Sequence, residues 1–163
     1  MNIKAQCCGL ILIAILFFFY MRQRKMMLST GAAFYRFFFA AFLCLFLDAF
    51  SIVGITYMDI WPIILVKFIC KSYLVSLLAV SLFAFLYASI DVYTPSNPIY
   101  KRLHNIFYGI GLLGLILIYV CPIMIHRGSN SDDVYTYGAS VITTYIFCIF
   151  FLISNFYLIF RKK

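Results

Sequence analysis

The chain has 163 residues, of which 66% are hydrophobic and 11% are charged, and it contains no glutamate. A soluble domain carries about 25% charged residues, so this composition excludes a water-soluble body. The formal net charge of +8 would suit nucleic acid if the basic residues gathered on one soluble face, but they lie between apolar runs instead. We therefore expect an integral membrane protein whose partner is the lipid bilayer, with no nucleic acid bound.

Five apolar runs account for most of the chain, and each is long enough to cross a hydrocarbon core about 30 Å thick. No alternating strand pattern competes with them, which excludes a β-barrel. Basic residues, rather than a small-residue cleavage site, follow the first run, so it predicts a retained helix and not a signal peptide. The sequence predicts one all-α membrane domain with five transmembrane helices, at about residues 5–21, 37–57, 62–93, 105–125 and 137–160.

The basic residues occur in alternate connections between these runs. Cytoplasmic loops are enriched in Lys and Arg, so the basic connections are expected inside the cell. With five spans, this places the N-terminus outside and the C-terminus inside the plasma membrane. The residues that set this orientation are Arg22, Arg24, Lys25 and Arg36 after the first run, Lys101 and Arg102 after the third, and Arg161, Lys162 and Lys163 after the fifth.

Three charged residues fall within the second and third runs. Asp48 lies near the middle of the second, where an unpaired carboxylate costs about 2.5 kcal/mol or more. Lys67 and Lys71 share one face of the third helix, and Lys67 is near enough to the surface to snorkel. A short connection predicts an antiparallel helix pair with Asp48 and Lys71 at one depth, roughly 13 Å from the turn. Their ion pair is either structural or a sensing or gating charge, and both readings stay open.

The residue types that carry chemistry do not form an active site in this sequence. The six cysteines have no zinc-site spacing and are expected to pack as small apolar side chains. His104 and His126 lie at opposite ends of the fourth run, which argues against a haem held by two histidines. No nucleophile–base pair, catalytic carboxylate pair or phosphate-binding glycine loop occurs. We therefore expect no catalytic residue, metal or cofactor, and no enzyme activity from this chain.

Four strings of the sequence resemble the N-terminal membrane region of clostridial GGDEF and EAL-type proteins, which make or degrade cyclic di-GMP. Pro122 also lies where that family tends to place a proline. The most specific likeness is the Tyr-Thr-Tyr-Gly turn together with the Lys-Ser-Tyr-Leu-Val-Ser string. The four strings are residues 1–12, Phe46–Val53, Phe68–Leu77 and Val134–Val141.

The resemblance implies a membrane sensory or anchoring module that serves a cyclic di-GMP enzyme. Neither a Gly-Gly-Asp-Glu-Phe nor a Glu-Ala-Leu motif occurs here, so a GGDEF or EAL output domain would act in cis or in trans. Small residues on one face of the third helix, at Ser72, Ser76 and Ala79, permit close packing, either between helices of this chain or in a homodimer. The alternative is a stand-alone small transporter or pore, for which the charges at Asp48, Lys67 and Lys71 would be the argument.

Overall fold

The computed structural model describes residues 8–9, 11–15, 18, 31–93, 98–127 and 134–161. Its main elements, in chain order, are α2 (Gly31–Thr56), α3 (Ile63–Val92), α4 (Pro98–Val120), β1 (Met124–Arg127), β2 (Val134–Tyr137) and α5 (Ala139–Arg161). All four of these helices are long and apolar enough to cross a membrane. The prediction of a helical membrane protein is therefore confirmed for four of the five expected spans.

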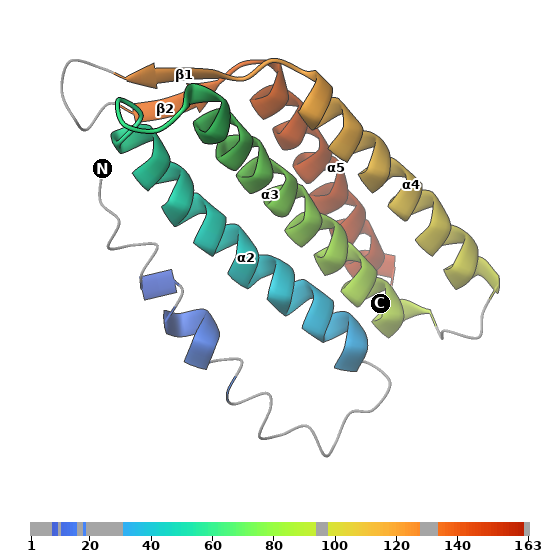
Figure 1. The fold of residues 1–163 in the computed structure, drawn as a ribbon. Helices are drawn as coiled ribbons and strands as arrows, with labels where there is room; N and C mark the ends of the chain where they lie inside the picture. Colours follow the sequence, from blue (N-terminus) through green and yellow to red (C-terminus); the bar gives the residue numbers. More distant parts are fainter. Residues whose placement is uncertain are drawn as a thin grey trace.

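The first predicted span, residues 5–21, lies only partly within the described residues. Residues 8–9, 11–15 and 18 are helical and are drawn in blue beside α2 (Figure 1). A Cβ added at Gly9 would lie 3.2 Å from a methyl carbon of Leu45 on α2. The described part of this segment therefore packs against α2, while the remainder of the span stays a prediction.

The helix boundaries differ from the predicted ones mainly at α4. Its start at Pro98, seven residues before the predicted one, suits a proline, because the first helical position needs no N–H donor. The helix ends at Val120 rather than Ile125, and Pro122 follows, whose ring and missing donor cannot continue a helix. The α2 helix begins at Gly31 instead of Phe37, because the apolar residues 32–35 continue the helix on the N-terminal side of Arg36.

A short antiparallel hairpin joins α4 to α5, where the sequence analysis expected only helices and a loop. Met124 faces Tyr137 and His126 faces Tyr135 across the two strands, and the rings of His126 and Tyr135 lie 4.8 Å apart. Strands of four residues are too short for a period-2 pattern to stand out beside the long apolar runs. We call this side of the bundle, where α2 and α4 end, the hairpin end (Figure 1).

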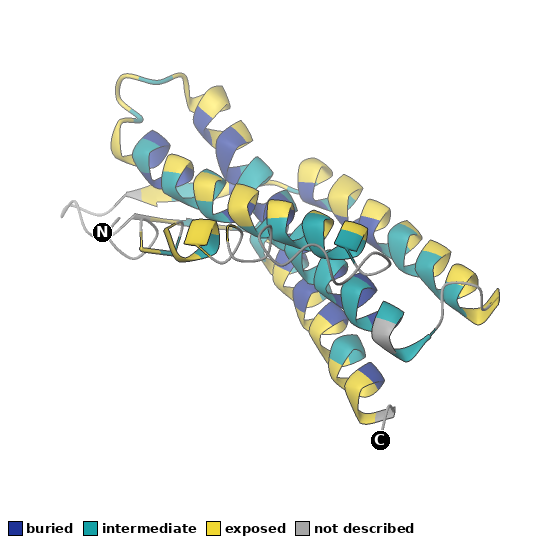
Figure 2. Cartoon of the chain, turned by 90° about the horizontal axis from the view of Figure 1, so that it is seen from below, coloured by how far each residue is buried: buried dark blue, intermediate teal, exposed yellow. Residues whose placement is uncertain are grey.

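The central helix of the bundle is α3, which packs against α2, α4 and α5. Its buried side chains recur every four residues or so, which places them along one stripe of the helix. Figure 2 shows the buried positions where helices meet and exposed residues on the outward faces of α4 and α5. The buried stripe of α3 consists of Val66, Cys70, Leu74, Leu78, Leu82 and Phe85.

Two glycines of α4 allow it to approach α3 closely. A Cβ at Gly111 would lie 2.7 Å from Cδ2 of Leu82, and one at Gly114 would lie 3.0 Å from Cδ2 of Leu78. The outward faces are apolar, as Leu112 and Ile153 illustrate with about 60% of their surface exposed. Apolar faces of this extent are stable against lipid rather than against water.

Candidate functional site

Asp48 lies on the wall of a cavity of about 220 Å³ at the hairpin end. Four elements contribute to this Asp48 cavity, namely α2, α3, β2 and α5. The residues that line it are Asp48, Ser51, Ile52, Ile55, Cys70, Tyr73, Tyr135, Thr136 and Tyr145.

The helical repeat explains how α2 builds its wall of the cavity. Asp48, Ser51, Ile52 and Ile55 follow one another at helical spacing, so they share one face of α2. The hydroxyl of Ser51 donates to the main-chain carbonyl of Asp48 at 2.8 Å. That bond uses the hydroxyl proton within the helix, so toward other groups this hydroxyl can act only as an acceptor.

The lining of the Asp48 cavity combines one carboxylate with three tyrosine side chains and two further hydroxyls. A carboxylate attracts a cation directly, and aromatic ring faces attract cations through their quadrupole. No group of three His, Cys, Asp or Glu side chains within the described residues could hold a metal ion. The arrangement therefore suits a small organic cation better than a metal ion coordinated by several protein ligands.

Lys71 contacts a different part of the molecule. Its ammonium Nζ donates to the carbonyl oxygens of Tyr119 at 2.6 Å and of Cys121 at 2.8 Å. These carbonyls lie at the C-terminal end of α4, where the last C=O groups lack helical partners and a positive charge is favourable. The sequence analysis missed this role because it considered only charged partners and placed the end of the helix at Ile125.

Ser140 of α5 binds the same end of α4. Its buried hydroxyl lies 2.7 Å from the carbonyl oxygen of Ile118 and 2.9 Å from that of Cys121. Its main-chain N–H donates to the carbonyl of Pro122 at 3.2 Å. The end of α4 is therefore hydrogen-bonded from two helices, by Lys71 of α3 and by Ser140 of α5.

Gly138 makes the close turn between β2 and α5 possible. Its φ of +121° lies in a region that side chains rarely adopt, and a Cβ there would lie 2.9 Å from the carbonyl oxygen of Pro122. Glycine alone meets both conditions without strain. The glycine of the Tyr-Thr-Tyr-Gly string therefore has a structural role against Pro122.

The three predicted charged residues line two different cavities on either side of α3. Lys67 is exposed and lines a second cavity, of about 370 Å³, together with Lys71 and Tyr119. Asp48 shares its own cavity with Cys70 and Tyr73, which lie beside Lys71 in sequence, and the two cavities have no lining residue in common. The ion pair between Asp48 and Lys71 stays a prediction, and it would have to coexist with the carbonyl contacts of Lys71.

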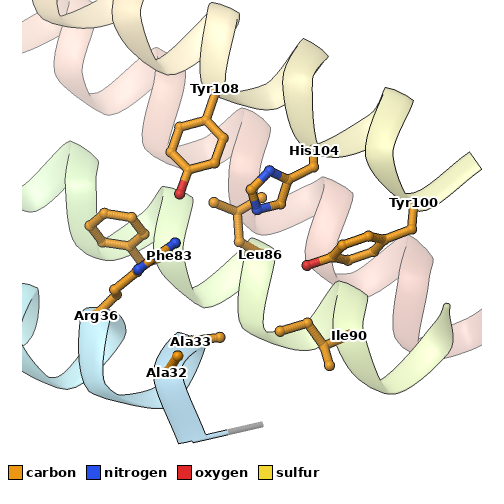
Figure 3. Close-up of a pocket in the computed structure, with 9 residues that line it drawn as sticks. All are labelled: Ala32, Ala33, Arg36, Phe83, Leu86, Ile90, Tyr100, His104 and Tyr108. Atoms are coloured by element: carbon orange, nitrogen blue, oxygen red, sulfur yellow. The ribbon is translucent and has the colours of Figure 1, made fainter. Parts of the chain in front are cut away.

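A third polar cavity, of about 210 Å³, lies toward the other end of the bundle, which we call the Arg36 end (Figure 3). Arg36 reaches into it from α2 and points toward Tyr108 of α4. Tyr100, His104 and Tyr108 lie four residues apart on α4, with ring centroids 5.4 Å and 4.6 Å apart along the row. The sequence analysis missed this site because it began the fourth helix at Asn105, which left two of the three rings outside the helix.

One residue of the predicted dimer face, Ser76, is buried within the chain. Ser76 has only 4% of its surface exposed, and its hydroxyl donates to the carbonyl of Tyr73 on its own helix at 2.7 Å. Ser76 is therefore buried within this bundle, whereas Ser72 and Ala79 are half-buried. A homodimer through this face stays a prediction.

Comparison of the chain with models of protein families, with curated proteins and with solved structures finds no match.

Proposed function

We propose that this chain is a non-catalytic membrane input module that binds a small cation in the Asp48 cavity and passes the binding event to a cytoplasmic output domain. The observation that carries the proposal is the composition of the cavity wall. Residues of α2, α3, β2 and α5 meet there around one carboxylate. A ligand bound among four elements can change their relative positions if it binds one arrangement more tightly than another.

The helix α5 is the element best placed to carry such a change. Tyr145 lines the cavity near the start of α5, and the helix then continues to Arg161. Thr144, Phe151 and Leu158 are almost fully buried along its length, so it is held against the bundle as a rigid body. Small shifts of packed helices are an established form of signal transmission in proteins.

The identity of the output domain rests on the resemblance to GGDEF and EAL-type proteins. Under this proposal, the chain localises a cyclic di-GMP enzyme at the plasma membrane, and regulates it, in cis or in trans. The basic tail of Arg161, Lys162 and Lys163 would lie at the inner surface, where anionic lipids attract positive charge.

The binding step is tested with the full chain purified in detergent and titrated with tetramethylammonium chloride, using sodium chloride at equal ionic strength as the reference. We expect saturable binding that Asp48→Asn weakens about tenfold, the size of effect that loss of one close charge can produce. Asp59→Asn, in the connection between α2 and α3 and outside the cavity lining, is the matched control. Equal binding by the protein and its Asp48→Asn variant would reject the cavity as the input site.

The signalling step is tested by comparing the chain alone with the chain joined to an output domain. The purified chain should neither make nor hydrolyse cyclic di-GMP and should not bind GTP, and turnover by the chain alone would overturn the input-module reading. Joined after Lys163 to a cytoplasmic diguanylate cyclase domain, it should make cyclic di-GMP production respond to tetramethylammonium in an Asp48-dependent way. Asp48-dependent uptake of the cation into liposomes would instead support the transporter or pore.

A further inference from the structure

Arg36 is the meeting point of two cavities of opposite character. One is the polar cavity that it shares with Tyr100, His104 and Tyr108. The other is an apolar groove of about 600 Å³ along α2. Apart from Arg36, the groove is lined by Ala14, Tyr35, Phe38, Phe39 and Phe42.

The polar cavity has the composition of an anion site. Its described lining holds a guanidinium, an imidazole and two phenol hydroxyls, and no carboxylate. A guanidinium presents five N–H donors in a planar fork that matches phosphate oxygens, and a tyrosine hydroxyl donates one more. Figure 3 shows the Arg36 side chain on one side of this cavity and the three rings of α4 on the other, above Leu86 and Ile90 of α3.

The groove has the composition of an acyl-chain site. Phe39 and Phe42 are exposed, with 68% and 41% of their surface accessible. They lie three and six residues beyond Arg36, which is roughly 4 to 9 Å further along the helix axis. The cationic group thus lies nearer the end of the bundle, and the apolar groove continues from it toward the middle.

We propose that this composite site binds one anionic phospholipid, with its phosphate between Arg36 and the Tyr100–Tyr108 face of α4 and one acyl chain along Phe39 and Phe42. Free phosphate shares the headgroup chemistry, but it would leave the adjoining groove unused. The basic connections predict that this end faces the cytoplasm, where Lys and Arg attract anionic headgroups. This role is independent of the Asp48 cavity and concerns the opposite end of the bundle.

The test uses the full chain in detergent and compares dioleoyl phosphatidylglycerol with dioleoyl phosphatidylcholine, which has the same acyl chains. Native mass spectrometry should retain one phosphatidylglycerol per chain, and titration should give about tenfold tighter binding than for phosphatidylcholine. Arg36→Gln should remove this preference. Arg102 is also basic and exposed on α4, but it lies outside both linings. Arg102→Gln should therefore keep the preference for phosphatidylglycerol.

Two further measurements distinguish a lipid headgroup from free phosphate and control for a folding defect. Inorganic phosphate should not displace the lipid, and full displacement by it would show a site for free anions and overturn the lipid assignment. Phe39→Ala changes an exposed side chain, so it should fold and bind the long-chain lipid several-fold more weakly, while its binding of short-chain dihexanoyl phosphatidylglycerol is unchanged. Equal binding of both headgroups, or no effect of Arg36→Gln in a folded chain, would reject the site.

Discussion

The two ends of the bundle hold their polar groups in different ways. At the hairpin end, Lys71 and Ser140 bind the last carbonyls of α4, and Gly138 lies directly against Pro122. At the Arg36 end, α2 and α4 both pack on α3 and leave a polar cavity with an exposed arginine between them. The hairpin end is thus fixed by bonds within the chain, whereas the described residues of the Arg36 end direct their donors into a cavity. A fixed frame suits selective binding of a small solute, and an open one suits exchange with lipid.

The roles of the hairpin end and the Arg36 end depend first on which of them faces the cytoplasm. A reversed membrane orientation would therefore change the interpretation of both ends. Reporter fusions after Lys25, Lys101 and Lys163 should all report the cytoplasm, because these positions follow the basic connections. A fusion after Ser131, between the two strands, should report the exterior. A cytoplasmic signal at Ser131 would reverse the assignment of both ends.

The next largest effect is expected at Gly138. Gly138→Ala should lower the free energy of unfolding in detergent by about 2–3 kcal/mol, because alanine is strained at this φ and its Cβ would meet the Pro122 carbonyl. Gly109→Ala is the matched control, since a Cβ there meets nothing within 4 Å and alanine favours a helix. Equal losses for the two variants would show that the hairpin end is not specially constrained.

Lys71→Met should cost about 2 kcal/mol, since it removes a charged donor from two helix-terminal carbonyls. Lys67→Met, on the same helix face but exposed, should change stability by less than about 0.5 kcal/mol. A double-mutant cycle of Lys71→Met with Asp48→Asn, measured by thermal unfolding, separates the two roles of Lys71. Coupling beyond experimental error would support the predicted ion pair, whereas additive losses would leave only the carbonyl contacts.

A smaller effect is expected at Ser140. Ser140→Ala removes a neutral hydroxyl that binds Ile118 and Cys121, and it should cost about 1 kcal/mol. Ser154→Ala removes a hydroxyl that donates to the carbonyl of Phe150 on its own helix at 2.8 Å, and it should cost less. A larger loss at Ser154 than at Ser140 would contradict the view that the end of α4 is the more constrained region.

The sequence was sufficient for the features that follow from apolar length and chain spacing. Hydropathy gave four described spans, and counting residues from the turn predicted Asp48 at the depth of Lys71. Cys70 and Tyr73, close to Lys71 in sequence, line the cavity of Asp48. Counting cannot establish on which face of a helix a side chain lies relative to a third helix. The contact of Lys71 with α4 therefore could not be foreseen.

The Arg36 cavity was missed for a related reason. Tyr100 and His104 join Tyr108 on one face only if the helix begins at Pro98, and hydropathy alone begins it where the apolar run begins. A proline at the first position of a helix is a recognisable start signal, so beginning the fourth helix at Pro98 would have revealed the row of rings. The hairpin gave a weaker signal, because each of its strands has only four residues.

The contact between Lys71 and the end of α4 also bears on how the chain enters the membrane. The ammonium and its carbonyl partners are separated by 48 and 50 residues, so α3 is synthesised well before its partner exists. A lysine within an isolated membrane helix is costly, and that cost falls only when α4 arrives. We expect α3 to remain near the insertion machinery until α4 joins it, so that the two helices enter the bilayer as a pair.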